Sequence, residues 1–367
     1  MQINLDESKT PWFVTNQAEI PVRLVKRVDE YQWQQEVEQE LAYPFDWSKA
    51  PLARVVLLKG SDASDIIITC DHIIADGKSV IFLLRDILQA IESPGKRLLP
   101  LSPKQSYEKM VKSEKDAQAL FFTPSRSIAI KPKILKNFRP YIHTWSLSKE
   151  ETITLINKSS QAQTSVHAAI CAAFLLTIAE RRVLHSNPRE SAALKCLSPI
   201  DIRKFLPLIE EDFGYYFTTL VTTSTITPSP PFWELARSIK EQLNQKMIPE
   251  KIFAHLPDIK GFASALPDNK SVVNTMEATN GHDILITNLG QLAIPHQYGK
   301  LSLATIYGPS LLCHVDQDLV VGIATLHNQM FFTLTYSGFE FSQTQVLNIQ
   351  KAAMLFLRNS WLKEASS

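Results

Sequence analysis

The segment that most constrains the fold runs from residue 65 to about residue 91. It begins with an apolar stretch at residues 65–70, continues through the motif CDHIIADG at residues 70–77, and ends in SVIFLLRDILQAI. A short apolar run followed by a longer run with apolar residues three and four positions apart is typical of a buried strand and a helix. The segment therefore predicts a domain in which helices pack on a sheet.

The remaining pattern predicts an α/β (α+β) fold with mixed sheets. Further strands are expected at 21–27, 53–58, 141–147, 193–203, 215–223, 283–287, 301–307, 319–325 and 330–336. Helices are expected at 30–41, from residue 149 behind the capping box of Ser148 and Glu151, at 166–182, at 232–245 and at 342–362. Strands and helices do not alternate regularly, so a Rossmann fold is not expected.

A change of composition divides the chain. Residues 93–140 are rich in Pro, Ser and Lys, which is typical of a connecting segment rather than of packed regular structure. We therefore expect an N-terminal lobe with this crossover over residues 1–140 and a C-terminal lobe over residues 141–367. The basic stretch 131–139 is read as a solvated part of the crossover.

The overall composition narrows the class of protein. Hydrophobic residues make up 45% of the 367 residues, as in globular proteins, and the net charge of +1 argues against a nucleic-acid binder. The cysteines Cys70, Cys171, Cys196 and Cys313 lack metal-site spacing and are expected to be free thiols in a reducing compartment. With no signal-peptide pattern and no apolar run of about 20 residues, we expect a cytoplasmic protein without an integral membrane segment.

The motif at residues 72–77 is the main candidate for chemistry. The chain has no GxGxxG, GxxxxGK[ST], GxSxG or HExxH pattern, which disfavours dinucleotide enzymes, P-loop proteins, α/β-hydrolases and zinc proteases. A neutral imidazole at the end of a rigid strand can accept a proton near pH 7, so His72 is a candidate general base. Asp76 would brace the turn, and Gly77 would allow the backbone to enter the helix. From spacing alone, the pattern fits an ordinary histidine beside a common Asp–Gly turn better than a catalytic one.

Several segments in a fixed order resemble one superfamily. They are FDWSKAPLARVVLL (45–58), IIITCDHIIADGKSVIFLLRDIL (66–88), SVHAAICAA (165–173), SPIDIR (198–203), FGYYF (213–217) and ITNLG (286–290). Together they resemble condensation domains and CoA-dependent acyltransferases, whose motif is HHxxxDG. The branch that looks most similar is the polyketide-associated acyltransferases, such as the phthiocerol/phthiodiolone dimycocerosyl transferases.

The resemblance implies two chloramphenicol-acetyltransferase-like lobes with the motif histidine, here His72, between them. It implies that Asp76 pairs with Arg203 of the second lobe as structural support. It also makes Asn288 a possible contact of the substrate or donor carbonyl, although a turn asparagine before glycine is an equal reading. The sequence DFG at 212–214 also resembles the DFGWG motif of plant-type acyltransferases in this superfamily, but it follows shortly after the SPIDIR segment instead of lying near the C-terminus. Asp212 is therefore interpreted as a coincidental match, and Gly214 as part of a strand.

The implied reaction is transfer of an acyl group from a thioester to an alcohol, which is a small molecule or lipid-like. No bound cofactor is expected, because acyl-CoA or a phosphopantetheine-linked acyl group is a co-substrate; an acyl carrier protein is a possible partner. Two alternatives stay open: an amide-forming condensation domain, and a catalytically degenerate carrier-binding or scaffold protein of the same fold.

The chain departs from the family pattern in two places. Asp71 stands where the family has its first histidine, and neighbouring side chains on an extended segment point to opposite sides. If Asp71 and His72 do meet, the carboxylate raises the pKa of the imidazole. The motif also arrives after fewer residues than in family members, so we expect a first lobe that is shortened at its N-terminus.

Overall fold

The structure is a computed structural model of the chain. It describes residues 2–5, 11–14, 18–95, 104, 107–111, 139–186, 191–227, 231–254, 261–262, 265, 269–311 and 319–362. Most of the predicted crossover, residues 93–140, lies outside these residues, as does Cys313.

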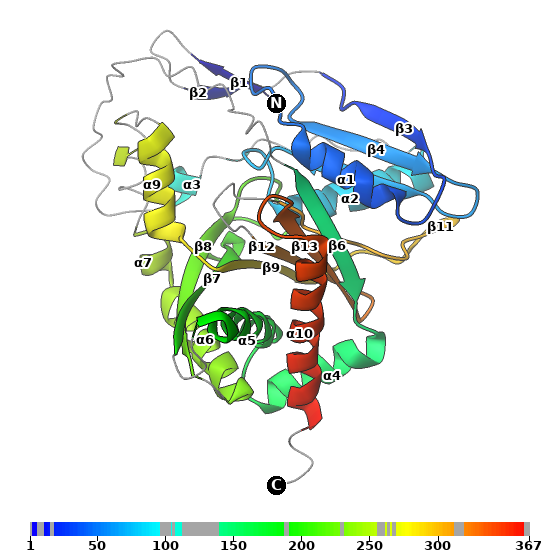
Figure 1. Ribbon diagram of the computed structural model, residues 1–367. Helices are drawn as coiled ribbons and strands as arrows, with labels where there is room; N and C mark the ends of the chain where they lie inside the picture. Colours follow the sequence, from blue (N-terminus) through cyan, green and yellow to red (C-terminus); the bar gives the residue numbers. More distant parts are fainter. Residues whose placement is uncertain are drawn as a thin grey trace.

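The first sheet has three strands in the order β3-β4-β5 (Figure 1). Its strands are β3 (Val22–Lys26), β4 (Ala53–Lys59) and β5 (Asp65–Cys70). Helix α1 (Gln32–Ala42) packs Trp33 and Val37 against Val56, Leu58 and Ile67 of this sheet. Helix α1 is also joined to the second sheet, because Gln34 Nε2 donates to Thr144 Oγ1 over 2.9 Å.

The second sheet has six strands in the order β6-β13-β12-β9-β7-β8. They are β6 (Pro140–Ser146), β7 (Ala192–Asp201), β8 (Phe217–Ile226), β9 (Ile284–Gln291), β12 (Leu319–Leu326) and β13 (Gln329–Ser337). Strand β9 runs parallel to β7 and β12, whereas the other pairs are antiparallel.

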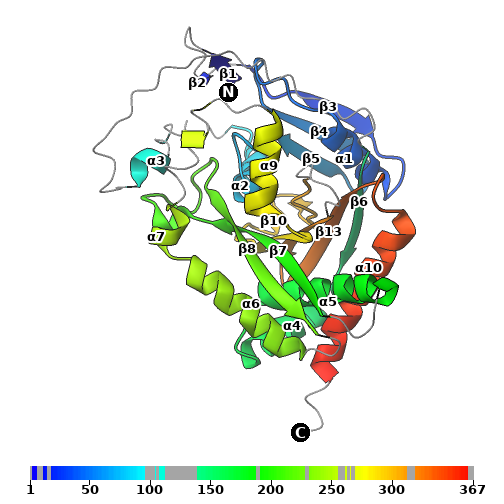
Figure 2. The same cartoon turned by 60° about the vertical axis from the view of Figure 1, so that its left-hand side comes forward.

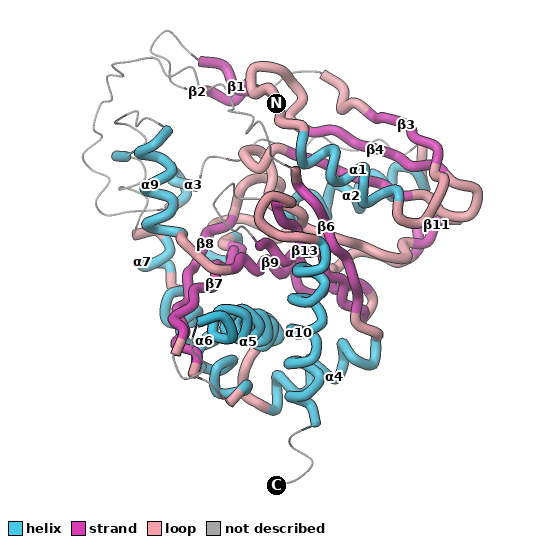
Figure 3. Tube along the Cα trace, viewed as in Figure 1, coloured by secondary structure: helices cyan, strands magenta, loops and turns pink. Residues whose placement is uncertain are grey.

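Helices cover one side of the second sheet (Figure 3). They are α4 (Lys149–Gln161), α5 (Val166–Ser186), α6 (Phe232–Lys246) and α10 (Gln343–Leu362). Residues 168–176 of α5 are at most 4% exposed, and together with α6, α10 and the sheet they form the largest hydrophobic cluster of the described chain.

Helix α2 (Gly77–Glu92) follows the first sheet in the chain and packs against the second lobe. Its Ile81 and Leu84 pack on a cluster that includes Leu326 and Phe331 of β12 and β13. Helix α9 spans Asn269–Asn280. The remaining elements have at most four residues each: β1 (Gln2–Leu5), β2 (Pro11–Val14), α3 (Tyr107–Met110), η1 (Arg203–Phe205), α7 (Pro249–Ile252), β10 (Gln297–Tyr298) and β11 (Leu301–Ser302). Figure 2 shows the two sheets from a second side.

The mixed α/β architecture that the sequence predicts is confirmed. The capping box is present, with Glu151 N donating to Ser148 Oγ and Ser148 N donating to the Glu151 carboxylate. The strand expected at 301–307 is wrong beyond its first two residues, because Leu303 and Tyr307 pack into a hydrophobic cluster instead of joining a ladder. The first sheet uses residues before 71 and the second uses residues after 139, while the division at residue 140 stays a prediction.

Among the described residues, no single helix is long and apolar enough to cross a membrane. Helix α4 and residues 166–182 of α5, which are bent by 98° from each other, are long and apolar enough only when they are taken as a pair.

Candidate functional site

The site begins where β5 ends. His72 follows the strand by two residues and is held in a turn in which Ile74 N donates to Asp71 O. Its ring stacks on Phe217 of β8 at a centroid distance of 4.9 Å and meets Tyr215 edge-on at 5.6 Å. His72 is exposed. It lies between the end of β5 and the two aromatic rings of Tyr215 and Phe217.

One hydrogen bond fixes the tautomer of His72. Its Nδ1 lies 2.9 Å from the carbonyl oxygen of Ala75. A carbonyl oxygen only accepts, so Nδ1 carries the hydrogen, and in the neutral ring Nε2 keeps its lone pair. His72 therefore has one nitrogen committed to its own turn and one nitrogen able to take a proton.

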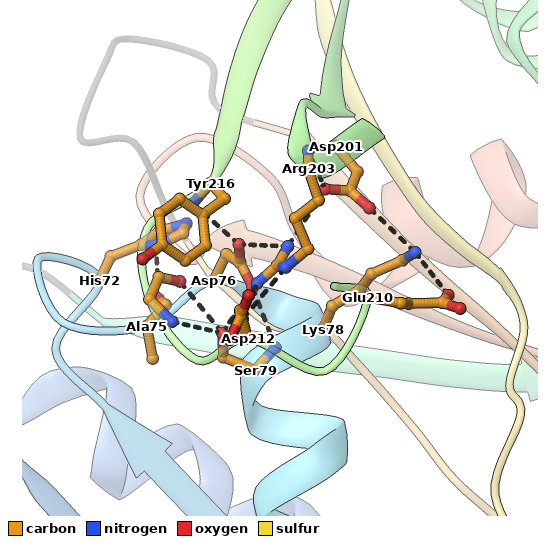
Figure 4. A network of polar contacts seen from close by, with 11 residues as sticks. His72, Ala75, Asp76, Lys78, Ser79, Asp201, Arg203, Glu210, Asp212 and Tyr216 are labelled. Atoms are coloured by element: carbon orange, nitrogen blue, oxygen red, sulfur yellow. Dashed lines mark hydrogen bonds and ion pairs between the residues drawn. The ribbon is translucent and has the colours of Figure 1, made fainter. Parts of the chain in front are cut away.

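The structure brings Asp76 and Arg203 together, 127 residues apart in the chain (Figure 4). Arg203 Nη1 lies 2.8 Å from Asp76 Oδ2, and Arg203 Nη2 donates to Asp76 Oδ1 over 3.0 Å. Both side chains are at most 6% exposed. Two parallel contacts between a guanidinium and a carboxylate are the strongest geometry for such a pair.

Every remaining polar group of this pair is bound. Asp76 caps α2 by accepting from Ser79 N, and it accepts from Tyr216 N. Arg203 donates to the carbonyl oxygen of Asp212 through Nε and Nη2. Buried charges are tolerated only when they are paired and fully hydrogen-bonded, and this pair meets both conditions. Because its bonds run from Asp76 to Arg203 and Tyr216, the cluster holds the His72 turn and the start of α2 against the 201–216 segment.

A second layer of ion pairs surrounds the buried one. Arg203 Nη1 also contacts Asp201 Oδ1 at 3.1 Å, and Lys78 Nζ lies 2.9 Å from Asp201 and 3.0 Å from Glu210. Burial disfavours the charged form of Arg203, but the hydrogen bonds and charge of Asp76 outweigh it and raise the pKa of the guanidinium. Burial likewise opposes ionisation of Asp201, and the Arg203 N–H and Lys78 outweigh it and lower the pKa of that carboxyl.

Two cavities adjoin this region and share no lining residue. The larger, of about 1090 Å³, is lined by His72, Asp76, Gly77 and Leu289 among others. The smaller, of about 760 Å³, is lined by Lys78, Arg203, Asn288 and Gly290 among others. The wall between them therefore consists of residues 76–78 and 288–290.

Gly77 and Asn288 both belong to this wall. A Cβ atom on Gly77 would lie 3.0 Å from Leu289 Cδ2, so the glycine permits the close approach of α2 to β9. The side chain of Asn288 accepts from Gly290 N over 2.8 Å, and Asn288 lines the smaller cavity, not the one with His72. This contact matches the reading as a turn asparagine, and its role in binding stays a prediction.

Asp71 does not form a described contact with His72. Its oxygens accept from Trp47 Nε1 at 2.9 Å and from Ile73 N at 3.0 Å. The carboxylate thus fixes the loop that follows β5.

The smaller cavity has a histidine of its own. His167, near the start of α5, lies with Nε2 2.8 Å from Ser198 Oγ and 3.4 Å from Cys171 Sγ. Burial lowers the pKa of His167 to about 4, so the ring is neutral at pH 7. Among the residues that the structure describes, no three His, Cys, Asp or Glu side chains are placed to hold a metal ion.

Family models match both halves of the chain. The model described as phthiocerol/phthiodiolone dimycocerosyl transferase C-terminus matches residues 136–337, which is more than half of the chain. The chain belongs to this family. The condensation-domain model matches residues 1–120, so the dimycocerosyl transferase C-terminus follows a condensation-type first part. Comparison with curated protein sequences gives no match.

Solved structures share the fold of this dimycocerosyl transferase family member at low sequence identity. The trichothecene 15-O-acetyltransferase of Fusarium sporotrichioides is 14% identical, with a TM-score of 0.66 over 93% of this chain and 76% of that one. Polyketide synthase associated protein 5 of Mycobacterium tuberculosis is 14% identical, with a TM-score of 0.61 over 98% and 86%. The first condensation domain of the CDA synthetase is 13% identical, with a TM-score of 0.64 over 98% and 83%.

Ser79 belongs to the site although its sequence motif did not indicate it. Ser79 Oγ lies within hydrogen-bond distance of Asp76, Arg203 and both backbone polar atoms of Gly214. Gly214 lies in a loop before β8 instead of in a strand, with φ +158°, and a Cβ there would lie 2.6 Å from the Tyr216 ring. The only signal in the sequence was Ser79 three residues after Asp76, which is the spacing of a helix cap.

Proposed function

We propose that the protein is an O-acyltransferase that moves an acyl group from a CoA or carrier-protein thioester to an alcohol, with His72 as general base. The observation that carries this proposal is the Nδ1–H···O contact with Ala75, which leaves Nε2 free beside a cavity of about 1090 Å³. The family of transferases to which the chain belongs supports the reaction class.

The reaction would use His72 twice. Nε2 takes the proton of the acceptor hydroxyl, and the oxygen attacks the thioester carbonyl carbon to give a tetrahedral intermediate. When the C–S bond breaks, the protonated imidazole returns that proton to the leaving thiolate, so an ester and a free thiol are formed. General acid–base catalysis of this kind contributes about 10²- to 10⁴-fold in rate.

The cluster of Asp76 and Arg203 supports this role without touching the substrate. It keeps the turn of residues 72–76 in place, and the turn supplies the Ala75 carbonyl that orients the ring. Catalytic groups must be held in a productive geometry by surrounding contacts, and this cluster provides them across the two lobes.

The test compares His72→Ala with a control at another exposed histidine, His296→Ala, which lines neither cavity. Release of free thiol from acyl-CoAs is measured with alcohol and amine acceptors. We expect His72→Ala to lose about 10²- to 10⁴-fold in rate, with a free energy of unfolding within about 0.5 kcal/mol of wild type. Unchanged turnover in His72→Ala would contradict the role of His72 as general base. Products that are amides and not esters would identify a condensation domain. If the wild-type protein turns over no thioester, a scaffold protein is favoured.

A further inference from the structure

The ring of His72 packs against two aromatic rings of the second lobe. Phe217 stacks on it, with ring centroids 4.9 Å apart and an angle of 22° between the planes. Tyr215 meets it at 5.6 Å and 61°, and the rings of Tyr215 and Phe217 are themselves 4.5 Å apart. The three rings therefore form one cluster, in which a face of the imidazole lies over a face of the Phe217 ring.

The backbone that carries the two rings is fixed to the motif turn. Asp76 N donates to Gly214 O over 2.9 Å, and Tyr216 N donates to Asp76 Oδ2 over 3.0 Å. The guanidinium of Arg203 lies over the ring of Tyr216, 5.1 Å from its centroid. Side chains alternate along an extended segment, so the residues on either side of Tyr216 meet His72, while Tyr216 itself meets the buried ion pair.

The two rings do not compete with the partners of the imidazole nitrogens. Both nitrogens lie at the edge of the imidazole, where Nδ1 is bonded to the Ala75 carbonyl, whereas Phe217 covers a face. His72 lines the larger cavity, and neither Tyr215 nor Phe217 lines one of the two described cavities. Any effect of these rings on transfer therefore acts through His72 and not through contact with a substrate.

An aromatic face distinguishes the two charge states of an imidazole. The π electrons make the face negative, so a cation above it is attracted, whereas a neutral imidazole lacks this attraction. At exposed sites, such a contact favours the charged form by about two- to fivefold. Because His72 is exposed, water still hydrates the charged ring, and the stacking shifts its balance toward the imidazolium.

The charged groups near the cluster are bonded to other partners. The carboxylate of Asp71 accepts from an indole N–H and a backbone N–H, and Asp76 is paired with Arg203. Cys70 keeps its hydrogen at pH 7, because burial and the charge of Asp71 raise the pKa of its thiol to about 11. The segment before the two rings has further charged residues in ion pairs, which are Asp201, Glu210, Glu211 and Asp212. The described contacts of the His72 ring are thus aromatic rings and a backbone carbonyl, and no carboxylate.

We propose that Phe217 and Tyr215 are positioning residues for His72, whose rings hold the imidazole in place and stabilise the imidazolium that forms when Nε2 takes the proton of the acceptor hydroxyl. This inference rests on the proposed function, because that reaction supplies the proton. When the proton passes on to the leaving thiolate, the neutral ring returns to the same contacts. Phe217 contributes more than Tyr215, because its ring is the one stacked face to face.

The test replaces each ring with an aliphatic side chain. Phe217→Leu and Tyr215→Leu keep an apolar group beside His72 and remove the aromatic face, whereas Phe217→Tyr keeps that face. Phe213→Leu is the matched control, since Phe213 is an exposed ring of the same segment without a described contact to the His72 ring. The charge state is followed by NMR of protein labelled with ¹³C in the histidine rings, and His72→Ala identifies the signal.

In Phe217→Leu, we expect the midpoint of the His72 titration to move to lower pH by about 0.4 to 0.7 pH units, which corresponds to a two- to fivefold loss. Tyr215→Leu should give a smaller shift in the same direction, and Phe217→Tyr and Phe213→Leu should titrate as wild type does. A midpoint that stays in place or moves to higher pH in Phe217→Leu overturns the inference. If Phe217→Leu does not fold, Tyr215→Leu decides alone, because Tyr215 is 39% exposed and its replacement leaves the core intact.

Transfer kinetics separate this inference from the proposed function. The kcat/KM for thiol release should fall at low pH as Nε2 becomes protonated, and Phe217→Leu should move this fall to lower pH by the same interval. At higher pH, its kcat should be about two- to fivefold below that of wild type, with KM little changed. A titration shift without turnover of any thioester would contradict the proposed function and leave the stabilised imidazolium standing. Transfer that depends on His72, with a pH profile that Phe217→Leu does not move, would leave the proposed function intact and remove only this inference.

Discussion

A histidine lines each of the two cavities. The two rings differ in which nitrogen forms a hydrogen bond with the protein and in how far the ring is buried. His72 in the larger cavity gives Nδ1 to the Ala75 carbonyl and is exposed. His167 in the smaller cavity has Nε2 on Ser198, and burial lowers its pKa to about 4. A base must exchange protons with a substrate near neutral pH, so accessibility and a free lone pair favour His72.

The wall between the cavities explains how two such different environments lie so close together. Asp76 faces the larger cavity and Arg203 faces the smaller one, and their ion pair spans the wall. In β9, Leu289 lines the larger cavity, whereas Asn288 and Gly290 line the smaller one. The alternation of side chains along a strand thus gives the two cavities different chemistry.

The largest expected effect comes from breaking the wall. Arg203→Ala leaves the Asp76 carboxylate buried without its counter-charge, so we expect the free energy of unfolding to fall by about 3 to 5 kcal/mol and transfer to be lost with it. Asp76→Ala should do the same, because it leaves the guanidinium buried. Urea unfolding measures the first quantity and thiol release the second.

A double variant shows whether the pair acts as a unit. Asp76→Asn combined with Arg203→Met removes both charges. The loss in free energy of unfolding should therefore be smaller than the sum of the losses measured for Asp76→Asn and for Arg203→Met singly. Single variants that melt like wild type would show that the ion pair does not join the lobes.

Much of the fold was predictable from periodicity. The strand of residues 65–70 and the helix after it follow directly from the apolar run and the spacing that come before and after the motif. Periodicity gave a wrong prediction for residues 301–307, because Leu303 and Ile306 pack in a hydrophobic cluster from a loop and not from a strand. Alternating apolar residues show that a segment is half-buried and do not show that it pairs with a strand.

The site was predictable only in part. Resemblance to known families pointed to His72, Asp76 and Arg203, and the structure brings the last two into contact. The bonds of Ser79 to Gly214 could not be predicted, since they use backbone atoms 135 residues away that every residue type carries. Asn288 was predicted as a site residue because ITNLG at residues 286–290 resembles a segment of the superfamily. Strand alternation places Asn288 in the lining of the smaller cavity, whereas Leu289 lines the larger one.

A smaller effect tests the environment of His167 by pH. Its pKa of about 4 in the folded chain lies below the value of about 6.5 for a free imidazole, so the unfolded chain binds more protons between these values. Stability should therefore fall as the pH drops from about 6.5 to about 4, by about 2 to 3 kcal/mol after allowance for partial solvent contact. In His167→Gln, urea unfolding at a series of pH values should show a shallower slope over this window. Equal slopes in the two proteins would contradict the burial of a neutral ring.

The smallest expected effect concerns the outer ion pairs on the smaller cavity's side of the wall. Lys78 contacts Asp201 and Glu210, but it is 27% exposed and Glu210 is 63% exposed, so solvent and salt screen these contacts. Lys78→Met keeps the aliphatic stem and should lower the free energy of unfolding by less than about 1 kcal/mol, with the difference shrinking as salt is added. If this variant is destabilised as strongly as Arg203→Ala, the outer pairs hold the lobes together as much as the buried pair does. The outer and the buried ion pairs would then contribute equally to the free energy of unfolding, and the position of the His72 turn would depend on contacts that salt weakens.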